Sequence, residues 1–130
     1  MTRSEEHVFN INHLEGLLEE WKSILHLEQW DIELKRSRQR DFLEGDNQGE
    51  ITFNKVECQA IIHILDPFDW VDTPFKQDME KTLVHELLHI IYADFEPEDP
   101  NSLQYTLWHR SIDSMARALV SLKRRGEATK

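Results

Sequence analysis

Apolar side chains near the start of the chain recur at intervals of three and four residues, the spacing of one face of an α-helix. The pattern predicts an amphipathic helix that begins at a capping box of Asn12 and Glu15 and ends near Leu27. The side chains on its apolar face are those of Leu14, Leu17, Leu18, Trp21, Ile24 and Leu25.

The pattern then changes to strict alternation, which is typical of a strand with one buried and one solvated face. A first strand is predicted over 30–35, and two more short strands follow over 50–54 and 59–65. Turn-forming residues without periodicity fill 38–49, so we expect a long hairpin loop there. Three such strands predict a small sheet, either mixed or antiparallel.

Helical spacing returns in the second half of the chain. Thr73 followed by Pro74 predicts the start of a helix, because proline in the first helical position sacrifices no hydrogen bond. This helix is predicted to reach about Ala93, and an acidic connection containing two prolines separates it from a last helix. Asn101 or Ser102 is expected to cap that helix, which should stop near residue 126 after three basic residues.

The order of one helix, three strands and two helices predicts an α+β fold in a single domain over residues 1–130. A formal charge of -10 argues against nucleic acid as a partner, because phosphate binding needs an excess of Lys and Arg. No segment has the composition of a signal peptide or a membrane span. Cys58 is the single cysteine, so we expect a reducing compartment, the cytoplasm; the oligomeric state stays open.

Candidate chemistry is concentrated in the second predicted helix, where His85, Glu86 and His89 form a His-Glu-Leu-Leu-His motif. Residues four apart on a helix share a face, so the two imidazoles can bind one zinc ion. Glu86 is rotated by about 100° from His85 and is better placed to activate a zinc-bound water. The alternative is a buried polar cluster without metal, which would have to satisfy all three side chains by hydrogen bonding.

A catalytic zinc ion usually has three protein ligands, so a third residue is needed. One metalloprotease pattern needs Gly and then His or Asp after the motif, where this chain has Tyr92 and Phe95. We favour His109 on the last helix, with Asp113 one turn later as the carboxylate that orients it. Asp113 as the ligand itself is the second choice, and the acidic connection supplies further candidates in Glu96, Glu98 and Asp99.

The motif in Lys81–His89, the later segment His109–Leu119 and the order of elements resemble the minigluzincins, small zincin metallopeptidases that phages and mobile elements often carry. That family usually presents Glu as the third ligand, and this chain has His109 at the position we align with it. The resemblance implies a zinc endopeptidase with one zinc ion per chain, a protein or peptide substrate, and Glu86 as general base.

The same resemblance implies a substrate that lies as an added strand along the second or third strand, with His63, Tyr92 or Tyr105 as possible auxiliary donors to the oxyanion. The competing hypothesis is a non-catalytic interaction module that keeps the zincin scaffold with structural zinc. Glu86 favours the enzyme, because a purely structural zinc site does not need a general base.

Overall fold

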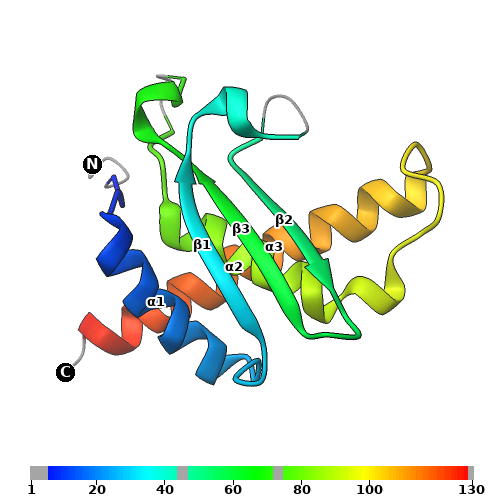
Figure 1. Cartoon of the computed structure of the whole chain (residues 1–130), viewed down its shortest axis with the longest axis horizontal. Helices are drawn as coiled ribbons and strands as arrows, with labels where there is room; N and C mark the ends of the chain where they lie inside the picture. The colour runs from blue at the N-terminus through cyan, green and yellow to red at the C-terminus, as the bar shows by residue number, and fades with distance from the viewer. Residues whose placement is uncertain (1–5, 44–46, 72–74, 129–130) are drawn as a thin grey trace.

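The computed structural model of the chain describes residues 6–43, 47–71 and 75–128. Three strands form one mixed sheet: β1 (Asp31–Ser37), β2 (Gly49–Asn54) and β3 (Gln59–Leu65). Their order is β1-β3-β2, with β3 parallel to β1 and antiparallel to β2 (Figure 1). The predicted strands and the α+β class are therefore confirmed, and β2 but not β3 is an edge strand.

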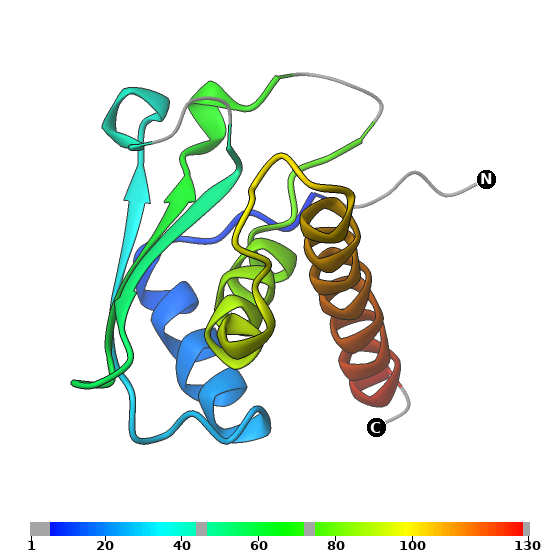
Figure 2. The same cartoon turned by 90° about the vertical axis from the view of Figure 1, so that its right-hand side faces the viewer.

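One face of the sheet is apolar, as the alternation over 30–35 predicted for the first strand. Leu34 of β1 and Ile51 of β2 both lie opposite Ile62, which is fully buried at the centre of β3. Ile64, two residues further along, is also fully buried and lies opposite Gly49. Helices α1 (Ile11–Ile24) and α2 (Met79–Ile91) cover this face, and α3 (Leu103–Ala128) lies beyond α2 (Figure 2).

The helix starts differ from the sequence predictions. The side chain of Asn10, not Asn12, caps α1 by accepting a hydrogen bond from the backbone N–H of His13. Asp78 caps α2 by accepting from the N–H of Lys81, so α2 starts at Met79. The predicted start at 73–74 lies outside the described residues, and residues 75–78 are not helical.

Helix α3 starts where the sequence placed it, because Ser102 Oγ accepts a hydrogen bond from the backbone N–H of Tyr105. It runs back along α2 in the opposite direction (Figure 1) and buries Ile112, Ala116 and Val120 against it. The turn between the two helices contains a short 3₁₀ helix, η3 (Ala93–Phe95). Two more, η1 (Gln39–Asp41) and η2 (Pro67–Asp69), follow β1 and β3, and η1 lies in the predicted loop over 38–49.

A buried ionic cluster, which we call the Glu80 cluster, joins all three α-helices. Glu80 of α2 is 4% exposed and accepts hydrogen bonds from Trp21 Nε1 of α1 and from Lys123 Nζ of α3. Arg124 binds the other Glu80 oxygen and both oxygens of Asp78. The cluster fixes the end of α3 against the start of α2.

Within the described ranges, no helix is both long enough and apolar enough to cross a membrane.

Candidate metal centre

The sequence motif occupies the middle of α2, where apolar neighbours bury most of the helix. Leu83, Val84 and Leu87 are fully buried, while His85 and His89 are only partly buried and face α3. The four-residue spacing places the two imidazoles one turn apart on this face. Their ring centroids lie 5.0 Å apart.

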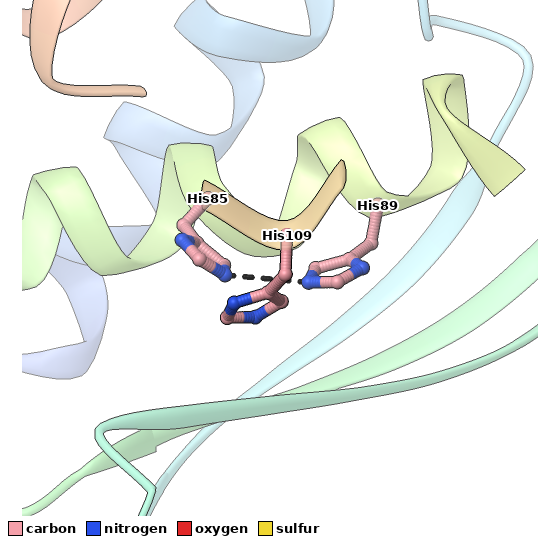
Figure 3. A group of neighbouring side chains, drawn as sticks. All are labelled: His85, His89 and His109. Carbon is pink, nitrogen blue, oxygen red and sulfur yellow. Dashed lines mark hydrogen bonds between the residues drawn. The ribbon is translucent and has the colours of Figure 1, made fainter. Parts of the chain in front are cut away.

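Three imidazoles converge at this point, because the turn between α2 and α3 brings His109 over the motif (Figure 3). One ring nitrogen from each of His85, His89 and His109 lies within 4.8 Å of the other two. The centroid of the His109 ring is 5.0 Å from that of His85 and 5.4 Å from that of His89. The structure therefore brings together the three residues predicted as ligands, and metal binding by them stays a prediction.

The two imidazoles of α2 have the spacing of zinc ligands. Two nitrogens held by one tetrahedral zinc at about 2.0 to 2.1 Å lie about 3.3 to 3.4 Å apart. Nε2 of His85 and Nε2 of His89 lie 3.3 Å apart. Burial, followed by the charge of neighbouring histidines, lowers the pKa of His85 and brings that of His89 to about 4, so both imidazoles are neutral at neutral pH. Neutral imidazole is the form that binds metal.

Asp113 orients a different histidine from the one we expected. Its Oδ1 lies 3.2 Å from Nδ1 of His85, and among the described residues it is this histidine, not His109, that Asp113 contacts. Because α2 and α3 run in opposite directions, the residue one turn after His109 meets the residue one turn before His89. A hydrogen bond at Nδ1 of His85 leaves its Nε2 free to face His89, as metal-binding histidines usually require.

Lys81 is a part of this centre that the sequence reasoning missed. Lys81 lies one helical turn before His85 on α2. Its Nζ lies 3.0 Å from Oδ1 of Asp113. Burial alone would raise the pKa of Asp113, but Lys81 and His85 outweigh it and lower that pKa. Asp113 is therefore an anion that can hold the His85 ring. The spacing of Lys81 four residues before His85 was the available signal.

Glu86 lies beside the histidines and is 6% exposed. Burial, followed by the nearby charge of Glu50, raises the pKa of its carboxyl to about 8. A cation bound by the adjacent imidazoles would act in the opposite direction and favour the carboxylate. The position suits a group that exchanges a proton with a molecule bound at the histidines.

A cleft of about 730 Å³ runs past the three histidines and Glu86. One wall is the edge strand β2 with the residues before it, and the other is formed by α2 and the start of α3. The other residues that line the cleft include Leu43, Gln48, Gly49, Glu50, Ile51, Thr52, Phe53, Lys81, Thr82, Glu96, Tyr105 and Asp113.

The other predicted residues divide between the cleft and the rest of the fold. Tyr105 lines the cleft, and its ring stacks on that of His109 with centroids 6.4 Å apart. His63 lies on the sheet face opposite Ile62, where Nδ1 pairs with Ser37 Oγ at 2.7 Å. It is therefore remote from the histidines of α2 and α3.

The acidic connection contributes one of its three candidates to the cleft. Glu96 lines it, whereas Glu98 and Asp99 do not. Asp99 instead accepts a hydrogen bond from the backbone N–H of Asn101 and stabilises the turn before α3. Tyr92 ends α2, and its carbonyl accepts a hydrogen bond from Trp108 Nε1, so it braces the turn rather than lining the cleft.

Comparisons with protein-family models, with curated proteins and with solved structures find no match to this chain.

Proposed function

We propose that this chain is a zinc-dependent endopeptidase that holds one zinc ion with His85, His89 and His109 and uses Glu86 as its general base. The observation that carries the proposal is the convergence of three imidazole nitrogens beside a buried carboxylate in an open cleft. A structural zinc site is usually closed by four protein ligands and does not need a carboxylate of this kind.

Zinc bound at these histidines would supply Lewis acidity that activates water and polarises a peptide carbonyl. Glu86 takes the proton of the attacking water and passes it to the leaving amine. Asp113 holds the His85 ring through Nδ1, and Lys81 keeps Asp113 ionised. Tyr105, beside His109 in the cleft, is the best placed of the auxiliary donors that we considered.

The cleft supports a protein or peptide substrate in extended form. β2 pairs with β3 on one side, and its other side borders the cleft. A peptide that adds to this edge as a further strand would be held by backbone hydrogen bonds beside the histidines. A single cysteine among 130 residues supports a reducing compartment, and we place the activity in the cytoplasm.

Metal analysis tests the first half of the proposal. Elemental analysis of protein purified without added metal should give about one zinc per chain. His85→Ala and His109→Ala should both lose it, while Arg110→Ala, the exposed neighbour on α3, should retain it. Zinc lost only with His85→Ala would move the third ligand to Asp113 or Glu96. A chain without zinc would refute the proposal.

Hydrolysis of a mixed peptide pool tests the second half. Glu86→Gln should retain zinc and lose peptide cleavage, because the amide cannot accept the proton of water. Equal cleavage by the native chain and this variant would remove Glu86 from the mechanism. A native chain that binds zinc and cleaves nothing would favour the non-catalytic interaction module.

A further inference from the structure

Gly49, the first residue of β2, lies close against two side chains of α2. It lies opposite Ile64, on the face of the sheet that the helices cover. A Cβ atom at this position would lie 2.5 Å from Cγ2 of Thr82 and 2.9 Å from Oε2 of Glu86. Carbon atoms in good contact are about 3.5 to 4.0 Å apart, so no side chain fits here without moving a neighbour.

Thr82 cannot easily make that room. Its Oγ1 donates a hydrogen bond of 3.1 Å to the carbonyl of Asp78, and the residue is 6% exposed. This bond fixes the rotamer of Thr82 and so fixes its methyl group against β2. Thr82 and Glu86 are one helical turn apart, and both face Gly49.

Glu86 depends on this packing for its position. Among the described residues, none donates a hydrogen bond to its carboxylate, and its neighbour Glu50 repels it. The side chain is 6% exposed, and one carboxylate oxygen occupies the space beside the Cα of Gly49. Packing against Gly49, and not a hydrogen bond from any described residue, therefore sets where the carboxylate lies.

We infer that Gly49 is a positioning residue for the proposed reaction: its missing side chain leaves the space that holds the Glu86 carboxylate between β2 and the histidines. The inference rests on the proposed function, since it concerns the placement of the proposed general base. It also assigns a role to the strand that borders the cleft, beyond contact with substrate.

The two contacts respond differently to an added methyl group. The Thr82 methyl is held by a hydrogen bond, so Gly49→Ala strains the strand-to-helix contact and lowers stability. The Glu86 carboxylate is the end of a flexible side chain, so it swings away at little cost in stability. Loss of stability and loss of turnover therefore have separate causes, and a second substitution can separate them.

The test compares Gly49→Ala with Gly16→Ala, a glycine of α1 where a Cβ meets nothing within 4 Å. Gly49→Ala should keep one zinc per chain and a KM within about twofold, while kcat falls by about tenfold to a hundredfold. Gly16→Ala should keep its kcat. Adding Thr82→Ser to Gly49→Ala removes Cγ2, so the unfolding midpoint should return to that of Thr82→Ser alone while kcat stays low.

An unchanged kcat in Gly49→Ala, or a kcat that recovers together with stability in the double variant, would overturn the inference. A crystal structure of Gly49→Ala gives a second readout that does not depend on activity: the Glu86 carboxylate should be displaced, and a carboxylate in its original place would refute the role of Gly49. If the zinc-loaded native chain cleaves no peptide, the proposed function fails. The crystal structure of Gly49→Ala then decides by itself whether Gly49 positions the Glu86 carboxylate.

Discussion

Replacing Glu80 with alanine removes the acceptor at the centre of the Glu80 cluster. Its Oε2 lies 2.7 Å from Trp21 Nε1 and 3.0 Å from Lys123 Nζ, and its Oε1 lies 3.2 Å from Arg124. Burial alone would lower the pKa of Lys123, but hydrogen bonds to carboxylates, Glu80 first, raise it to about 12. Hydrogen bonds to Glu127 and Glu20 also raise this pKa, so Lys123 stays charged in the variant, in a site that has lost its buried anion.

The expected loss is about 3 kcal/mol, the lower end of the range for breaking a buried ion pair. The lower end applies because Lys123 also pairs with Glu20 and Glu127, and Arg124 keeps both oxygens of Asp78. The indole N–H of Trp21 loses its acceptor. Because Trp21 is 1% exposed, water does not replace that acceptor. For a chain of 130 residues, this loss lowers Tm by about 10 °C.

Thermal and urea unfolding followed by circular dichroism measure this effect. Glu127→Ala is the matched control, because its side chain is 50% exposed and its pair with Lys123 is worth about 0.3 to 0.5 kcal/mol. Glu80→Gln should lie between the two, since the amide oxygen can still accept from Trp21. If Glu80→Ala is no less stable than Glu127→Ala, the cluster does not hold the helices together as we describe.

Three further predictions concern single contacts. Asp113→Ala should weaken zinc binding by about tenfold to a hundredfold in a chelator competition, because His85 loses the acceptor at Nδ1; equal affinity would contradict that role. Gly16→Ala should raise the free energy of unfolding in urea by about 0.5 to 1 kcal/mol, since the position is helical, exposed and uncrowded; a loss would show an unrecognised contact. Hydrogen bonds from Arg38 and then from the N–H of Gln39 lower the pKa of Asp69 from 3.8 to about 2. The stability from this ionised carboxylate is thus present above about pH 4 and lost as the pH falls toward 2. The urea midpoints of the native chain and of Asp69→Asn should therefore converge near pH 2. A difference between the two midpoints that does not change with pH would contradict this role of Asp69.

The strands and the histidine pair were predictable because they depend on local spacing. Residues two apart in a strand share a face, which places Ile62 and Ile64 together in any sheet, and residues four apart share a face in any helix. His109 was reachable because the last helix has to fold back to bury Ile112. These inferences needed only the periodicity of each element.

The errors come from contacts between elements. Asp78 is a residue type that caps helices, but its carboxylate is held by Arg124, near the other end of the chain, and no local signal shows that pairing. The partner of Asp113 depends on the axial offset of α3 against α2, which sequence spacing leaves undetermined. Gly49 reads as a turn residue in a loop, and only the packed structure shows what lies against it.

The third histidine comes from a different helix than the first two, and this has a mechanical consequence. A metal held by His89 and His109 would close the segment between them into a ring, as a reversible cross-link does. Two apolar side chains in the first turns of α3 lie largely in solvent, with Leu103 69% and Leu107 49% exposed. Backbone amides there should exchange with deuterium rapidly after chelation and slowly with zinc. The stiffness of one wall of the cleft would then follow the supply of zinc.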